Sequence, residues 1–140
     1  MRVFLDTNVL VSAFATRGLC ADLLRYVLVE HDLLVAEVVL AELRRVLKTR
    51  IRLPAPTVEE IERFLREYEV IPKPRTPPAT KLRDPDDAWV LESALVGHAD
   101  VLVTGDHDLL SLAGGVPLRI VDPRGFWKLL REEAGPEDHP

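Results

Sequence analysis

Short apolar segments alternate along this chain with longer segments in which apolar residues recur at helical spacing. The short segments end in polar or turn-forming residues and predict strands, whereas the longer ones predict amphipathic helices. The predicted strands are Arg2–Leu5, Asp32–Ala36, Glu69–Ile71, Val101–Thr104 and Leu118–Val121. The predicted helices are Asn8–Ala15, Ala21–Glu30, Val38–Thr49, Val58–Glu67, Pro85–Gly97, Asp106–Ala113 and Pro123–Glu132.

The predicted strands are apolar on both faces and are joined by helices, which is typical of a parallel sheet covered on both sides. We therefore predict an α/β fold with three layers, α/β/α, around a central, mostly parallel sheet of about five strands. The 140 residues suffice for one domain, which we place at residues 1–133. Residues 134–140 carry no apolar anchor, and we expect them to form a disordered tail.

Cysteine content and hydropathy favour the cytoplasm. Cys20 is the only cysteine, so no disulfide can form within the chain, which suits a reducing compartment. Asp6 interrupts the first apolar run before a signal-peptide core is complete, and no apolar run reaches the roughly 18 residues that span a bilayer. We expect a soluble protein without membrane contacts.

Charge is unevenly distributed, although the net charge is -5. Residues 1–83 carry 14 Lys and Arg against 11 Asp and Glu, whereas residues 84–140 carry 4 against 12. Two basic runs contain no acid, and each is either a solvated surface that suits the negative end of a helix dipole or a surface that contacts phosphates. They consist of Arg44, Arg45, Lys48, Arg50 and Arg52, and of Lys73, Arg75, Lys81 and Arg83.

Acidic residues follow two of the predicted strands directly. Asp6 comes after the first strand, and Asp106 and Asp108 come after the strand Val101–Thr104. Ligands of open parallel sheets bind outside the carboxyl ends of the strands. One of Asp106 and Asp108 is also expected to cap the next helix. Asp6 needs a partner or a cation, because Thr7 or Asn8 is equally able to provide the cap there.

Helical spacing puts two further acids on apolar faces. Glu42 lies between Val38 and Val46, one turn before and one turn after it, so it is predicted to be buried with a cation or to lie at the rim of a charged cleft. A structural salt bridge is the alternative. Asp87 shares the face of Leu91 and Ala94 on the next helix but one.

The neighbours of Asp87 have structural explanations. Asp84 precedes Pro85 and is predicted to cap the helix that Pro85 begins. Asp86 is predicted to face solvent, where an acid in the first turn suits the helix dipole. Asp87 is therefore the acid of this motif that we assign to the site.

The selected carboxylates come from four regions of the chain, and spacing identifies no inward-facing Lys or Arg that would neutralise them. Oxygen donors of this kind suit Mg²⁺ or Mn²⁺ rather than zinc, which prefers histidine and thiolate ligands. The four histidines show no spacing typical of metal ligands. The predicted metal ligands are Asp6, Glu42, Asp87 and Asp106, with Asp84 and Asp108 as possible additions.

These motifs together resemble the PIN-domain nucleases, and most closely the VapC-like ribonucleases that are toxin components of prokaryotic toxin-antitoxin modules. The resemblance covers about residues 2–125 and consists of motifs in a fixed order. They are Leu5-Asp6-Thr7-Asn8-Val9-Leu10, Glu42, Asp84-Pro85-Asp86-Asp87, and Val103-Thr104-Gly105-Asp106-His107-Asp108-Leu109-Leu110.

The resemblance implies a Mg²⁺- or Mn²⁺-dependent endoribonuclease that hydrolyses phosphodiester bonds of single-stranded RNA. It matches Asp6, Glu42 and Asp87 to the core catalytic acids and Asp106 to a less constant fourth, while Asp84 and Asp108 are ambiguous. Thr7, Asn8 and Thr104 are expected to support the acids or to contact substrate. It also implies a small antitoxin protein as partner and a homodimer or higher oligomer.

Other classes fit the sequence less well. Phosphatases of the haloacid dehalogenase type need a second acid two residues after the first, where this chain has Asn8, and Toprim domains need Glu where it has Asp6. A housekeeping PIN nuclease of RNA processing and a non-catalytic PIN-like binding module stay open as alternatives.

Two predicted helices carry more apolar positions than a single core-facing stripe needs. The segments Ala21–Val29 and Val58–Tyr68 therefore predict either a partner interface or fully buried helices. An exposed interface would form an apolar patch around Leu24, Leu28, Ile61 and Phe64.

Overall fold

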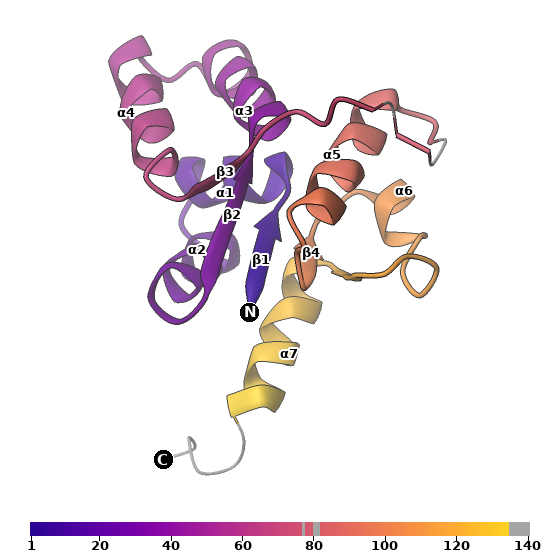
Figure 1. Ribbon diagram of the computed structural model, residues 1–140. Helices are drawn as coiled ribbons and strands as arrows, with labels where there is room; N and C mark the ends of the chain where they lie inside the picture. Colours follow the sequence, from indigo (N-terminus) through magenta and orange to yellow (C-terminus); the bar gives the residue numbers. More distant parts are fainter. Residues whose placement is uncertain (77, 80–81, 135–140) are drawn as a thin grey trace.

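Five parallel strands form one sheet in the order β3-β2-β1-β4-β5 (Figure 1). The computed structural model describes residues 1–76, 78, 79 and 82–134. The strands are β1 (Arg2–Leu5), β2 (Asp32–Ala36), β3 (Glu69–Ile71), β4 (Val101–Val103) and β5 (Arg119–Val121). Each was predicted from its apolar pattern, and the predicted parallel sheet is confirmed.

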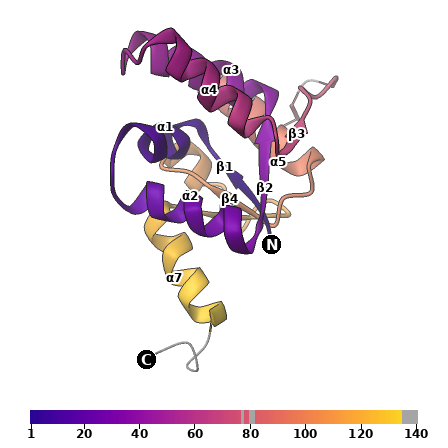
Figure 2. The same ribbon diagram turned by 90° about the vertical axis from the view of Figure 1, so that its left-hand side faces the viewer.

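Helices cover both faces of this sheet, which confirms the predicted α/β/α arrangement. In Figure 2, α1 and α2 lie on one side of β2 and α5 lies on the other, while α3 and α4 pack against each other. None of the helices in the described residues is long and apolar enough to cross a membrane. The helices are α1 (Thr7–Ala15), α2 (Leu19–Glu30), α3 (Glu37–Thr49), α4 (Ala55–Leu65), α5 (Pro85–Val96), α6 (His107–Leu110) and α7 (Pro123–Ala134).

The central strands carry the core. Val3, Phe4 and Leu5 of β1 are at most 1% exposed, and β4 is buried over its whole length. Burying one large apolar side chain stabilises the fold by about 1.5–3 kcal/mol, so apolar residues on both faces fix the register of the middle strands. Their carboxyl ends are thereby held at one edge of the sheet.

Helix boundaries differ from prediction where proline or a cap sets the end. Helix α4 begins at Ala55, three residues before the predicted start, because Pro56 lies in the first turn, where no intrahelical donor is required. Helix α6 has four residues rather than the predicted eight. The chain leaves it at Ser111 and turns through Gly114, which adopts the left-handed conformation with φ of 87°.

Helices α2 and α4 are not fully buried, since Tyr26 and Val29 of α2 are 37% and 78% exposed, and the partner interface stays a prediction. Leu24 is only 6% exposed, and Leu28, Ile61 and Phe64 are half-buried against the core. The Phe64 ring packs edge-on against Phe14, with 6.5 Å between the ring centroids. This ring contact joins α4 to α1, and α1 and α2 pack on each other.

Candidate metal-dependent active site

The register of β1 and β4 brings the first two polar residues of the site together. Leu5 pairs with Val103, so Asp6 and Thr104 follow at the same level of the sheet edge. The backbone N–H of Asp6 donates to the carbonyl oxygen of Val103 at 3.0 Å, and Thr104 Oγ1 donates to Asp6 Oδ2 at 2.7 Å. Two segments almost a hundred residues apart are thus joined at one carboxylate.

Asp6 caps α1, a role that the sequence left open among Asp6, Thr7 and Asn8. Its Oδ1 accepts a hydrogen bond from the Thr7 backbone N–H at 2.7 Å, and Asn8 Nδ2 lies 3.4 Å from its Oδ2. The carboxylate is 5% exposed, and burial raises its pKa, although the hydrogen bonds from Thr104 and Thr7 act in the opposite direction. The three predicted supporting residues, Thr7, Asn8 and Thr104, all contact Asp6.

Three further acids gather where α5 and α6 begin. One carboxylate oxygen from each of Asp87, Asp106 and Asp108 lies within 4.8 Å of the others. Asp106 also caps α6, since its Oδ1 accepts from the backbone N–H groups of Asp108 at 2.8 Å and Leu109 at 3.2 Å. Asp106 therefore both caps α6 and belongs to the acid cluster.

Electrostatic repulsion connects these acids with Asp6. Burial is the largest cause that raises the pKa of Asp87 to about 7, followed by the charges of Asp106, Asp84 and Asp6. Within the described part of the chain, none of the ion pairs involves any acid of the cluster. Among the residues that the structure describes, the site is a concentration of negative charge that no ion pair neutralises.

Glu42 lies farther out, at the rim of a groove between α3 and α5. Its side chain is 37% exposed, and its Oε1 lies 3.9 Å from an Arg45 nitrogen, a loose ion pair. Burial and then the Asp6 charge raise the pKa of Glu42, while Arg45 lowers it. Of the two predicted placements, the rim of a charged cleft is the one that the structure shows.

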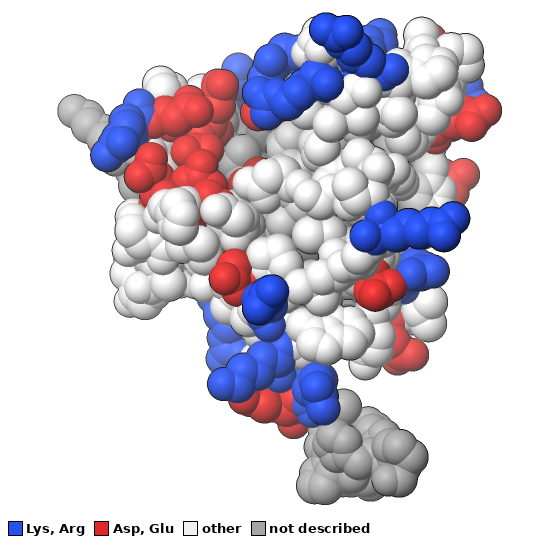
Figure 3. Space-filling model, turned by 180° about the vertical axis from the view of Figure 1, so that it is seen from behind, with Lys and Arg blue, Asp and Glu red and all other residues white. Residues whose placement is uncertain are grey.

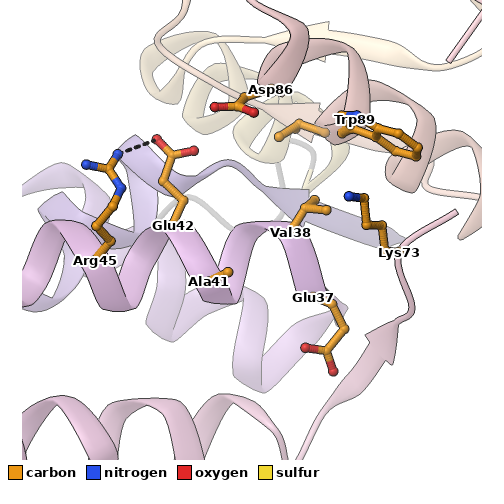
Figure 4. Close-up of a pocket in the computed structure, with 9 residues that line it drawn as sticks. Glu37, Val38, Ala41, Glu42, Arg45, Lys73, Asp86 and Trp89 are labelled. Carbon is orange, nitrogen blue, oxygen red and sulfur yellow. Dashed lines mark ion pairs between the residues drawn. The ribbon is translucent and has the colours of Figure 1, made fainter. Parts of the chain in front are cut away.

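Asp84 and Asp86 have the positions expected from the motif. Asp84 caps α5, since its Oδ1 accepts from the backbone N–H of Asp86 at 2.9 Å. Asp86 is exposed, as predicted, but it also lines the groove opposite Glu42 (Figure 4). The prediction missed Trp89, which lies on the same wall of the groove. Its spacing of three residues from Asp86 is the signal that could have identified it.

The basic residues lie beside the acids rather than among them. Figure 3 shows acidic side chains gathered in one region of the surface, with Lys and Arg on two sides of it. Arg44 points elsewhere, because its guanidinium donates two hydrogen bonds of 2.9 Å to the Glu62 carboxylate on α4. The remaining cations of the first run, Arg45, Lys48, Arg50 and Arg52, are exposed, and Lys81 of the second run lies outside the described residues.

The donor set fits a hard divalent cation. Every group in the cluster is a carboxylate, and in the described residues no cysteine or histidine belongs to it. Mg²⁺ and Mn²⁺ prefer oxygen ligands of this kind, and a cation would relieve the repulsion that raises the Asp87 pKa. The Thr7 hydroxyl next to Asp6 is a buried polar group for which the described structure provides no hydrogen-bond partner.

Comparison with known families agrees with this arrangement. The family model of the PIN domain matches residues 2–108. The chain belongs to the PIN domain family. The match spans β1 to the start of α6, so this PIN domain includes all the acids described above. None of the curated proteins matches the chain significantly.

Solved structures share the fold of this PIN domain. VapBC2 from Rickettsia felis, bound to a DNA fragment from its promoter, superposes with a TM-score of 0.63 at 20% identity over 87% of this chain and 98% of that one. A toxin-antitoxin complex from Klebsiella pneumoniae gives a TM-score of 0.60 at 18% identity over 86% and 97%. FitAcB from Neisseria gonorrhoeae gives 0.60 at 16% identity over 87% and 98%. The PIN domain fold therefore persists at low identity over almost the full length of these chains.

Proposed function

We propose that this PIN domain is a Mg²⁺- or Mn²⁺-dependent endoribonuclease that hydrolyses phosphodiester bonds of single-stranded RNA. The observation that supports it best is the acid cluster at the carboxyl end of the sheet. Three carboxylates approach one another within 4.8 Å without a pairing cation in the described residues. Such repulsion destabilises the metal-free fold, which is the expected cost of a site built to bind a cation.

The acidic residues are proposed to bind the cation and to orient the attacking water. Asp6, Asp87 and Asp106 hold the cation, with Asp84 and Asp108 as possible additional ligands and Glu42 as ligand or as orienter of the attacking water. When bound, a divalent cation stabilises charge on the phosphate oxygens and promotes deprotonation of the attacking water. Thr104 Oγ1 and the Thr7 N–H keep Asp6 in one orientation. No side-chain nucleophile is required.

The exposed cations beside the acids are proposed to contact the RNA backbone. Arg44 is the exception, because its pairing with Glu62 joins α3 to α4. The proposed contacts from the first basic run are therefore Arg45, Lys48, Arg50 and Arg52, joined by Lys73, Arg75 and Arg83 from the second.

We further propose that the protein is the toxin of a toxin-antitoxin module. The structures from Rickettsia felis and Klebsiella pneumoniae that share its fold are described as VapBC2 and as a toxin-antitoxin complex, which supports a small antitoxin as partner. On this proposal the protein is cytoplasmic and forms a homodimer or higher oligomer. Normal growth on overexpression would instead indicate a housekeeping nuclease.

A cleavage assay tests the enzymatic proposal. Single-stranded RNA should be cut with Mn²⁺ or Mg²⁺, and EDTA should abolish cleavage. Asp87→Asn should be folded and inactive, while Glu92→Gln, which removes a charge from the same helix outside the cluster, should keep activity. RNA binding without cleavage in the presence of metal would establish the binding-module alternative.

A further inference from the structure

The groove beside the acid cluster has features that metal binding does not require. It has a volume of about 560 Å³, within the range of about 300–1,000 Å³ typical of small-molecule sites. Val38 and Val90 line its apolar part, and Trp89 lies on the α5 wall (Figure 4). Trp89 is half-buried, so part of its side chain is accessible from the groove.

Charge is arranged along the groove in a definite order. Glu42 and Asp86 lie at the end that adjoins the acid cluster, where the Asp86 charge raises the pKa of Glu42 and Arg45 forms a loose ion pair with Glu42. Lys73 lies beside Trp89 (Figure 4). Glu37 contributes little charge to the groove, because its carboxylate points away from Trp89 and accepts two hydrogen bonds from Arg66 at 2.7 and 3.0 Å.

A nucleobase with a phosphate on each side fits this groove, since the base can lie on Trp89, one phosphate near Lys73 and the other near the acid cluster. We infer that the groove between α3 and α5 binds one nucleobase of single-stranded RNA, stacked on Trp89, next to the phosphate that the acid cluster cleaves. The inference rests on the proposed ribonuclease function and assigns to Trp89 the binding of substrate rather than the chemistry.

Lys73 covers the stacking surface in the free protein. Its Nζ lies 4.6 Å from the centroid of the Trp89 ring, a cation–π contact at an exposed position. Such a contact is weaker than stacking of a base on an aromatic ring, so an entering base displaces the ammonium group. Lys73 is exposed and lies two residues after the end of β3, so after displacement it pairs with an RNA phosphate. The same lysine thus protects the ring in the free state and contributes to affinity in the bound state.

Tryptophan fluorescence tests the stacking without any cleavage. The chain has two tryptophans, and Trp127 lies on α7 against Tyr26. Trp127→Phe therefore leaves Trp89 as the only emitter, and Trp89→Phe is the matched control. In EDTA, a single-stranded RNA oligonucleotide should quench the Trp127→Phe protein in a saturable manner and leave the Trp89→Phe protein unchanged. Absence of quenching in the Trp127→Phe protein overturns the inference.

Cleavage kinetics separate this inference from the proposed function. Trp89→Ala should lower kcat/KM on single-stranded RNA by about 5- to 160-fold, the range expected for one lost base stack, while Trp89→Phe should stay within about 3-fold. Mn²⁺ binding measured by calorimetry should be equal in Trp89→Ala and in the unmodified protein. If the unmodified protein cleaves RNA and Trp89→Ala cleaves it equally well, the subsite is wrong and the nuclease stands. If Trp89 is quenched by RNA that the protein does not cleave with Mn²⁺, the subsite stands and the nuclease proposal fails.

Discussion

Removing the charge of Asp87 should stabilise the metal-free protein while it abolishes cleavage. In the folded chain, burial and neighbouring acids raise the Asp87 pKa to about 7, whereas the unfolded value is 3.8. The folded state therefore binds a proton more tightly than the unfolded state. The resulting stability is fully present below about pH 4 and is lost as pH rises to about 7.

The magnitude follows from the size of the shift. One pKa unit corresponds to about 1.4 kcal/mol, so the full shift sets a ceiling of about 4 kcal/mol. The carboxylate is partly exposed, and solvent screening reduces the expected effect to about 1–2 kcal/mol. Asp87→Asn should thus match the unmodified protein near pH 4 and exceed its free energy of unfolding by that amount at pH 8.

Urea denaturation in EDTA, measured across pH 4 to 8, provides the test. Asp86→Asn is the matched control, because Asp86 is exposed and its substitution should change stability little over this range. Added Mn²⁺ should reverse the order, since only the protein with Asp87 gains from binding the cation. Equal stability of Asp87→Asn and the unmodified protein at every pH would refute the electrostatic argument. Activity lost in Asp86→Asn but kept in Asp87→Asn would show that the acids are assigned to the wrong face of α5.

Three further predictions concern Asp6, the basic residues and the assembly of the protein. Thr104→Val removes the hydroxyl that donates to Asp6 and should lower the free energy of unfolding by about 1–3 kcal/mol and reduce cleavage. Thr104→Ser should retain the stability and the cleavage activity. Replacing Arg45, Lys48 and Arg50 by Gln should flatten the salt dependence of RNA binding by about 0.7 per lost contact, while Arg44→Gln, which breaks a pair with Glu62, should leave the slope unchanged. Light scattering should give a mass above 15.7 kDa for the purified protein. Co-expression with the adjacent reading frame should give a stable complex without ribonuclease activity. A strictly monomeric, non-toxic protein would contradict the toxin proposal.

The fold was predictable because its signals are local and repeated. The three central strands are apolar on both faces, and each connection is long enough for a helix, so the parallel sheet follows from the pattern. Helix ends depend on weaker interactions, and α6 is shorter than its apolar spacing suggested. Asp106, predicted as the first helical residue, is the N-cap instead, and the chain turns through Gly114 after the helix ends at Leu110.

The acids were partly predictable for the same reason. A helical projection uses only local geometry, and it was sufficient to separate Asp87 from Asp86 and to place Glu42 at a cleft. It carries no information on distances between elements. The tightest grouping joins Asp87 and Asp106 to Asp108, because the turn at α6 directs two acids toward the start of α5.

The pairing of Arg44 and the position of Trp89 could not be predicted from the sequence, because both depend on contacts between elements distant in the chain. Arg44 belongs to a basic run, yet its guanidinium is bound by Glu62 because α4 folds back on α3. Trp89 and Lys73 meet only because the chain leaving β3 passes the first turns of α5. Asp6 and Asp106 follow strand ends, which every sheet of this topology brings to one edge, and Asp87 lies in the first turn of α5. The groove depends instead on how α3 and α5 approach each other. Substrate preference should therefore change with substitutions in the α3–α5 groove while the chemistry at the strand ends is retained.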